Sequence, residues 1–203
     1  MKTTRKISIG SAGFSLIEVL VTIMLLAFGL LGVAGMQART SKIELESYQR
    51  SQALTLLNDM ASRLQSAPLA SRSAYVTTGR TPAYLGVGID VESCTALTDL
   101  AERDLCEWNN ALNGAAETLS GGANVGAMLG GRGCITEIRA PVTTAGACVG
   151  GLYEVTIVWQ GLFETNAPGA NNACAKVSTS LFGGEKFRRS VSLPVGAGLP
   201  GCV

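Results

Sequence analysis

The chain has 203 residues, of which 47% are hydrophobic and 15% charged, so it can form one modest domain core beside a membrane helix. Its formal net charge of +1 argues against the broad basic field that nucleic-acid-binding proteins use. Histidine is absent, which removes His-assisted catalysis and the commonest nitrogen ligand of metals. We therefore expect no enzyme, no nucleic-acid partner, no metal site and no cofactor.

A membrane-length apolar segment follows a short basic leader. Residues 14–35 read FSLIEVLVTIMLLAFGLLGVAG. As a helix they cover roughly 33 Å, about the thickness of the hydrocarbon core of a bilayer. Lys2, Arg5 and Lys6 precede this segment, and basic residues beside a first span normally stay in the cytoplasm. We expect the rest of the chain to lie outside the cytoplasm.

Glu18 is a single carboxylate about one helical turn inside this apolar segment. An ionisable group costs roughly 2.5–3.5 kcal/mol on insertion scales at the centre of a membrane helix, and less near an interface. A positive charge from the same chain or from a neighbour would offset that cost. Cleavage after Gly13 would create such a charge at the α-amino group of Phe14.

The stretch Gly-Phe-Ser-Leu-Ile-Glu-Val-Leu-Val that begins at Gly13 resembles the class III signal of type IV pilins and pseudopilins. The resemblance implies cleavage by a prepilin peptidase between Gly13 and Phe14, N-methylation of Phe14, and pairing of Glu18 with an N-terminal amine during assembly. A secretory signal peptide and an uncleaved signal anchor are the alternatives. A secretory signal has an apolar core of only about 7–15 residues and a small-residue cleavage site after it. Here the core is longer, and residues 36–38, Met-Gln-Ala, are a poor site.

An amphipathic segment follows the apolar one. Its apolar residues recur at three- and four-residue steps, which indicates a helix; they are Ile43, Leu54, Leu57, Met60, Ala61 and Leu64. No proline interrupts residues 14–67, so both segments can form one helix of about 50 residues, roughly 80 Å long, that ends before Pro68. The pilin family shows such a shared helix.

Three glycines, Gly29, Gly32 and Gly35, repeat inside the apolar segment. Each costs up to about 1 kcal/mol of helix propensity relative to alanine in water. They can let neighbouring helices approach closely. The pilin resemblance instead implies that this stretch loosens during assembly, and a third alternative is that membrane helices simply tolerate glycine.

Residues 68–93 contain scattered Pro and Gly and are interpreted as a connection. A second amphipathic helix is predicted from an apolar pattern, with Asp99 and Glu102 spaced like a capping box; the pattern comprises Leu97, Leu100, Ala101, Leu105, Trp108 and Leu112. We expect Trp108 to pack in the core. The glycine-rich residues 121–133 are predicted to form a flexible loop that lacks the Lys-Ser/Thr ending of a P-loop.

Three strands are predicted in the last third of the chain. Tyr153, Val155, Ile157 and Trp159 alternate with residues 154, 156, 158 and 160, which suits a sheet with one face on the long helix. Residues 134–142 and 187–193 are further candidates, and residues 134–160 are predicted to form an antiparallel hairpin.

The 6 cysteines all lie in this distal part of the chain; they are Cys94, Cys106, Cys134, Cys148, Cys174 and Cys202. An even number in an oxidising compartment favours disulfides, and six cysteines allow 15 connectivities. Nearest-neighbour pairing is preferred here: Cys94 with Cys106, Cys134 with Cys148 and Cys174 with Cys202. The Cys134–Cys148 pair is the best supported of these, because it would brace the loop of the predicted hairpin. A metal site is the alternative, but no C-x-x-C is present.

Two distal stretches resemble the PilV family of minor pilins, the type IV pilus modification proteins. They are RDLCEWNNAL, residues 103–112, and YEVTIVWQG, residues 153–161. The number of cysteines and the long tail from Asn166 depart from that family's pattern. The resemblance implies an α+β type IV pilin fold, a long N-terminal helix packed on a C-terminal antiparallel sheet.

The same resemblance implies a set of partners and a domain layout. The partners are the prepilin peptidase, other minor and major pilins, the inner-membrane assembly platform, the lipid bilayer and, as a further candidate, a pilus-tip adhesin. The layout is a leader at 1–13, a membrane and assembly helix at 14–36, its amphipathic half at 37–67 and a periplasmic domain at 68–203. The implied function is a minor pilin that primes or caps type IV pilus assembly. A type II secretion pseudopilin and a membrane-tethered adhesin or ligand-binding module that does not polymerise are the alternatives.

Overall fold

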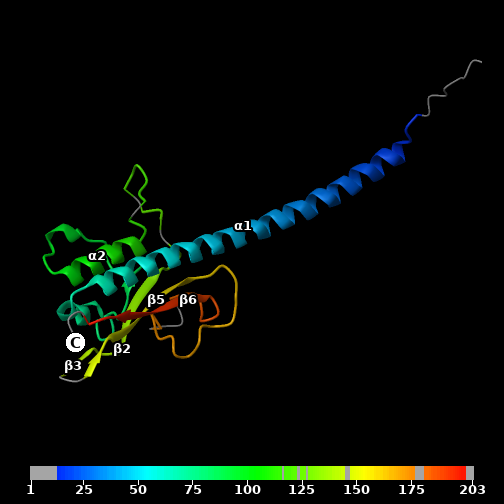
Figure 1. The fold of residues 1–203 in the computed structure, drawn as a ribbon. Helices are drawn as coiled ribbons and strands as arrows, with labels where there is room; N and C mark the ends of the chain where they lie inside the picture. The colour runs from blue at the N-terminus through cyan, green and yellow to red at the C-terminus, as the bar shows by residue number, and fades with distance from the viewer. Residues whose placement is uncertain are drawn as a thin grey trace, which may run out of the picture. The chain divides into compact units, whose positions relative to one another are not determined.

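A computed structural model describes residues 13–115, 117–122, 124–126, 128–144, 147–176 and 181–199. The chain divides into two compact units, Met1–Glu44 and Leu45–Val203. Helix α1 (Leu16–Ser66) contributes residues to both (Figure 1). Its 51 residues confirm the predicted single long helix, and it ends two residues before Pro68.

The first unit is helical from Leu16 onward and buries nothing in its described part. Every residue from 13 to 44 is exposed, including all the large apolar side chains. The helix is long and apolar enough to cross a membrane. These side chains therefore have no partner within their own unit and require another apolar environment.

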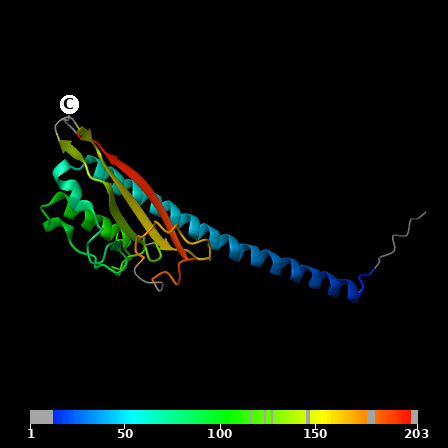
Figure 2. The ribbon, with the colours of Figure 1, turned by 90° about the horizontal axis from the view of Figure 1, so that it is seen from below.

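The second unit is an α+β domain built on an antiparallel sheet of order β1-β2-β5-β6 (Figure 2). Its strands are β1 (Leu85–Gly86), β2 (Arg132–Arg139), β5 (Gly151–Gln160) and β6 (Arg188–Ala197), and a separate two-stranded ribbon consists of β3 (Val142–Thr144) and β4 (Ala147–Val149). Helix α2 (Leu100–Leu112) and the 3₁₀ helices η1 (Leu69–Tyr75) and η2 (Cys94–Ala96) complete it. The α+β prediction is confirmed, and the architecture is consistent with the type IV pilin fold.

The predicted strands correspond to β2, β5 and β6. Cys134 of β2 lies opposite Thr156 of β5, so the predicted antiparallel hairpin is confirmed. The register shifts between Glu137 and Arg139, and β3 and β4 follow between β2 and β5. This ribbon and the two-residue strand β1 were not predicted, because short irregular pairings leave no sustained alternation in a sequence.

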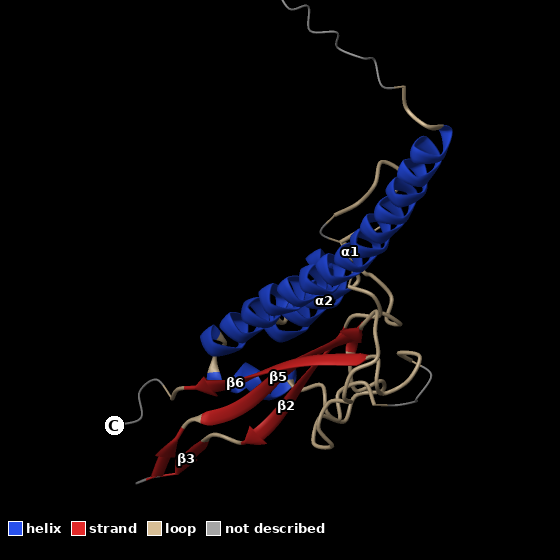
Figure 3. Cartoon of the chain, turned by 90° about the vertical axis from the view of Figure 1, so that its right-hand side faces the viewer, coloured by secondary structure: helices blue, strands red, loops and turns tan. Residues whose placement is uncertain are grey.

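The main core lies where α1 residues of this unit and α2 cover one face of the sheet (Figure 3). Trp108 is 0% exposed, which confirms its predicted core position, and its Nε1 donates to the carbonyl of Leu56 at 3.1 Å. The predicted cap of α2 is also present, since the Asp99 side chain accepts from the Glu102 N–H at 3.0 Å.

The predicted apolar stripe of α1 is wrong at two positions. Ile43 and Leu54 are exposed, whereas Leu57, Met60, Ala61 and Leu64 are buried. Ala53, which the pattern did not include, is buried as well. Alanine has a small side chain and contributes little to a hydrophobic pattern, so periodicity alone does not predict that Ala53 is buried.

The opposite face of the sheet carries a second, smaller core. Val158 packs there with Cys134, Cys174 and Phe182, which agrees with the alternation that placed residue 158 on the face away from the helix. Arg188 is 1% exposed and donates to the Asn172 side-chain oxygen at 3.1 Å and to the carbonyl of Cys174 at 3.3 Å. The described residues around Asn172, Cys174 and Phe182 are therefore part of the folded domain.

The disulfides differ in part from the prediction. The Cys94–Cys106 bond is confirmed, but Cys134 bonds to Cys174, so the predicted Cys134–Cys148 and Cys174–Cys202 pairs are wrong. Cys134 sits in the body of β2 opposite Thr156, whereas Cys148 lies opposite Thr143 in the β3–β4 ribbon beyond the end of β2. Cys134 and Cys148 are therefore several strand residues apart. Since each strand residue adds about 3.3 Å, the distance between them far exceeds the 4.4–6.8 Å that separates the two Cα atoms of a disulfide. Cys148 is also disulfide-bonded, and Cys202 lies outside the described residues.

Candidate functional site

The predicted cleavage site lies in exposed, non-helical chain immediately before α1. Residues 13–15 have no regular structure, and no atom lies within 4 Å of the position that a Cβ on Gly13 would take. Phe14 is 84% exposed. The carbonyl of Ser15 accepts from the N–H of Glu18 at 3.0 Å and of Val19 at 3.3 Å, which starts the helix. Proteases need exposed backbone that can be extended, and the Gly13–Phe14 bond meets that requirement.

Glu18 lies in the first turn of α1 and is exposed. The positive end of the helix dipole favours a carboxylate there. The Thr22 hydroxyl donates to the main-chain carbonyl of Glu18 and leaves the carboxylate free. Among the described residues Glu18 has no ion-pair partner, so its charge is available to a cation from outside the described chain.

The three glycines of the apolar segment lie inside α1, which continues through them without a break. None of Gly29, Gly32 and Gly35 has an atom within 4 Å of a notional Cβ, so each leaves open space beside the helix. A surface without side chains lets a neighbouring helix approach closely. The structure thus offers a smooth contact surface next to the exposed apolar side chains.

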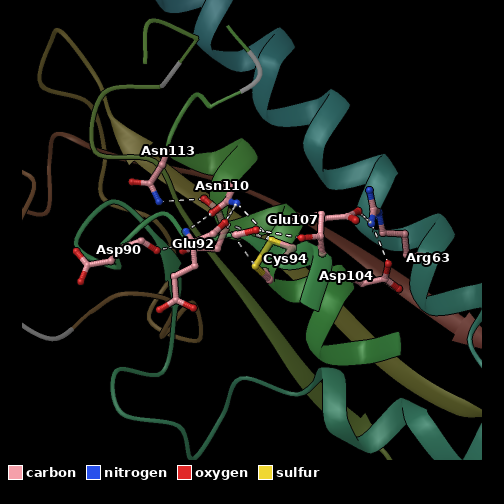
Figure 4. Close-up of a disulfide and its surroundings, with 12 residues drawn as sticks. Arg63, Asp90, Glu92, Cys94, Asp104, Glu107, Asn110 and Asn113 are labelled. Carbon is pink, nitrogen blue, oxygen red and sulfur yellow. Dashed lines mark hydrogen bonds and ion pairs between the residues drawn. A yellow bond between two sulfur atoms is a disulfide. The ribbon is translucent and has the colours of Figure 1, made fainter. Parts of the chain in front are cut away.

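The second unit contains a charged cluster around Arg63 (Figure 4). Arg63 Nη1 lies 2.8 Å from Asp104 Oδ1 and 2.6 Å from Glu107 Oε2, and its Nε lies 3.1 Å from Asp59 Oδ2. Tyr75 donates its hydroxyl to the other oxygen of Asp104. These contacts connect α1, η1 and α2, and they assign the cluster a structural role.

Burial and hydrogen bonding change the pKa values in this cluster. Burial acts to lower the pKa of Arg63, but the bonds to Glu107 and Asp104 outweigh it and raise the pKa above its ordinary value. Burial raises the pKa of Tyr75, and the hydrogen bond to the Asp104 carboxylate raises it further. Both groups therefore stay protonated through the neutral range, and neither is suited to exchange protons there.

Asparagines on α2 and at its C-cap hold the preceding loop (Figure 4). Asn110 Nδ2 donates to the carbonyl of Glu92 at 2.7 Å, and its Oδ1 accepts from the Glu92 N–H at 3.2 Å. Asn109 Nδ2 donates to the carbonyl of Asp90 at 2.8 Å, and Asn113 Nδ2 to that of Ile89 at 3.3 Å. The sequence prediction missed these roles, although polar side chains recurring along an amphipathic helix can indicate bonds to a neighbouring loop.

The described residues contain no group of three or more His, Cys, Asp or Glu side chains that could hold a metal ion. Cys94, Cys106, Cys134, Cys148 and Cys174 are all disulfide-bonded. Of the predicted site residues, the structure brings Gly13, Phe14 and Glu18 together at the start of α1, and places the cysteines in the second unit.

Comparison with known proteins finds one signature. The prokaryotic N-terminal methylation motif matches residues 10–34, which include Gly13, Phe14 and Glu18. This motif is the prepilin-type leader of type IV pilins and pseudopilins, so it supports the pilin superfamily and points to a structural, non-enzymatic class of protein. No curated protein and no solved structure matches the chain.

Proposed function

We propose that the chain is a minor pilin that prepilin peptidase cuts between Gly13 and Phe14 and that then primes or caps a type IV pilus together with other minor pilins. One observation carries this proposal: α1 begins inside the methylation motif, has Glu18 in its first turn and exposes its whole apolar stretch up to residue 44. Phe14 is the methylated N-terminus of the mature subunit.

Assembly follows from the need to cover this helix. Lipid covers it before assembly, and like helices of other subunits cover it in a filament. Packing between helices drives the movement of the helix from lipid into the filament. The hydrophobic effect contributes little, since lipid is as apolar as the helix. Heterologous contacts that do not close produce a fibre. The α-amino group of a neighbouring Phe14 pairs with Glu18 and sets the register.

The membrane topology is part of the proposal. Residues 1–13 face the cytoplasm, 14–36 span the inner membrane, 37–67 continue the helix and 68–203 form the periplasmic domain. The basic leader supports this orientation, and the disulfides fit an oxidising compartment. The assembly platform, other minor pilins, major pilins and a tip adhesin are the partners of the extruded subunit.

Processing can be tested by intact-mass spectrometry of the chain isolated from membranes. We expect a mature chain that begins at methylated Phe14. Gly13→Glu should retain the leader, because a large charged side chain replaces the glycine before the cut. Gly169→Glu is a matched control, since no atom lies within 4 Å of a Cβ at this exposed loop position. An intact leader on the wild-type chain, with pili unaltered, would overturn the proposal.

Assembly can be tested with Glu18→Ala against Glu44→Ala, which removes another exposed carboxylate from α1. We expect both variants in the membrane, but recovery with sheared pili should fall at least tenfold for Glu18→Ala only. Normal recovery of Glu18→Ala would refute the pairing role.

A deletion strain separates the two pilin-like functions. Loss of surface pili, seen by electron microscopy, supports the minor pilin, whereas loss of protein secretion with normal pili supports a pseudopilin.

A further inference from the structure

A cavity of about 200 Å³ lies on the face of the sheet that points away from α1 and α2. Its floor is formed by β2 and β5, and its walls come from residues 78–83 and 171–174. Its lining combines apolar side chains and the disulfide with polar residues, one of which is charged. The polar lining residues are Thr78, Thr136, Glu154, Thr156, Asn171 and Asn172.

Covalent and hydrogen bonds fix both walls of this cavity. The Cys134–Cys174 disulfide ties one wall to β2. Arg188, almost fully buried, holds the same wall through Nη1 and Nη2 bonds to Asn172 Oδ1 and the Asn172 carbonyl, at 3.1 and 3.2 Å. Thr77 anchors the other wall, since it exchanges bonds of 2.9 and 3.0 Å with the backbone of Ile135. The cavity is therefore preformed, which lowers the entropic cost of binding a ligand.

The cavity is open to solvent at Thr78, Thr136 and Asn171, and it presents hydrogen-bonding groups of both kinds that a ligand can reach. Within the described part of the chain, the Glu154 carboxylate and the Asn171 amide have no hydrogen-bond or ion-pair partner. Asn172 Oδ1 accepts from Arg188, which leaves both N–H donors of the Asn172 amide available. Thr136 is paired only with Thr78, at a long 3.5 Å. The lining thus offers one carboxylate acceptor beside amide donors and hydroxyl groups.

We infer that this cavity binds a single ring of a polyhydroxylated ligand, a monosaccharide unit. Each sugar hydroxyl both donates and accepts, and two adjacent hydroxyls can donate to the two oxygens of the Glu154 carboxylate while accepting from the asparagine amides. An ammonium group only donates, so it would leave those amides unmatched. Pockets for drug-sized ligands measure roughly 300–1,000 Å³, so this smaller cavity suits a ligand no larger than one sugar ring. This site is independent of cleavage and of assembly.

The test is ligand-observed saturation-transfer NMR with the full chain in a zwitterionic, sugar-free detergent. The probes are methyl α-glucoside, methyl β-galactoside, methyl α-mannoside and N-acetylglucosamine, with n-butylamine as the cationic probe. We expect saturation of at least one sugar, with the millimolar affinity typical of so small a ligand. Saturation of butylamine alone, or of no sugar, overturns the inference.

Two variants locate the binding. Glu154→Gln preserves the shape of the side chain and should weaken sugar binding at least tenfold, whereas Glu117→Gln, at an exposed loop position outside the cavity lining, should not change it. Ala173→Phe fills the cavity from its wall and should abolish binding. Circular dichroism verifies the fold of each variant. Equal binding by wild type and by folded Glu154→Gln and Ala173→Phe would show that the sugar binds elsewhere and would overturn the assignment.

Discussion

The two parts of helix α1 share one secondary structure and have opposite surroundings. From residue 16 to 44 every side chain is exposed, including a continuous set of large apolar residues. From residue 45 to 66 the same helix buries Ala53, Leu57, Met60, Ala61 and Leu64 in the core of its own unit. One stretch is packed by its own chain, and the other has no apolar partner within the described residues.

Because the two stretches of α1 have different surroundings, we expect one to determine the stability of the second unit and the other to affect assembly. The second unit has cores on both faces of its sheet and internal disulfides, so its unfolding should depend on its own residues. Both tryptophans, Trp108 and Trp159, lie in that unit and are buried. Urea unfolding of the detergent-solubilised full chain, followed by tryptophan fluorescence, therefore reports on the second unit alone. Substitutions in the two stretches of α1 should separate cleanly in that measurement.

Removal of a disulfide should have the largest effect. In the chain-entropy description, the Cys134–Cys174 bond, with a sequence separation of 40, contributes about 4 kcal/mol, and the Cys94–Cys106 bond, with a separation of 12, about 3 kcal/mol. We expect Cys134→Ala with Cys174→Ala to lower the free energy of unfolding more than Cys94→Ala with Cys106→Ala. The reverse order would show that the smaller core, on the face of the sheet away from α1 and α2, contributes little to the stability of the second unit.

A single glycine should have the next largest effect. A Cβ on Gly133 would lie 2.7 Å from Trp108 Cζ3, so Gly133→Ala forces the indole ring to move and should cost about 1–3 kcal/mol of unfolding free energy. Gly196→Ala is the matched control, because it changes another strand glycine that has no atom within 4 Å of its Cβ position. Equal stability of the two variants would mean that Trp108 can relocate without cost.

Gly133 also illustrates what the sequence could and could not predict. The long helix, α2 with its cap, and strands β2, β5 and β6 were predictable, because each has a sustained period or a capping pattern. Gly133 was interpreted as part of a flexible loop, yet it lies in β2 against Trp108. Position 133 requires glycine because Trp108, from α2, packs against it. A contact between distant elements leaves no local pattern in the sequence.

The disulfides show the same limit. Cys94 begins η2 and Cys106 lies within α2, the next helix, so proximity in sequence identifies their bond. Cys134 and Cys174 meet because the chain folds back over the outer face of the sheet, which is a tertiary event. The hairpin prediction carried no register, and only the observed pairing places Cys134 several strand residues away from Cys148. The start of α1 was predictable to within two residues, because its motif is contiguous in sequence.

A smaller, pH-dependent effect is expected at the junction of α1 and α2. Tyr75→Phe removes the hydrogen bond to Asp104 and should cost about 1–2 kcal/mol near neutral pH. Burial, and then this bond, raise the pKa of Tyr75 above its ordinary 10.0. The folded state therefore keeps the proton after the unfolded chain has lost it, so the advantage of tyrosine is complete below pH 10 and declines as the pH rises beyond it. Unfolding of both proteins at pH 8 and pH 11 measures this, and a constant difference would contradict it.

The smallest effect is expected in the exposed stretch of α1, where it tests the comparison most directly. Leu25 is exposed and contributes to no core of the described chain, so Leu25→Ala should change the unfolding free energy of the second unit by less than about 0.5 kcal/mol. Leu57→Ala, the same substitution in the same helix but at a buried position, should cost about 2–5 kcal/mol. If Leu25→Ala proved as costly as Leu57→Ala, the first stretch of the helix would be folded by its own chain, and its exposed apolar surface could no longer be assigned to lipid and to other subunits.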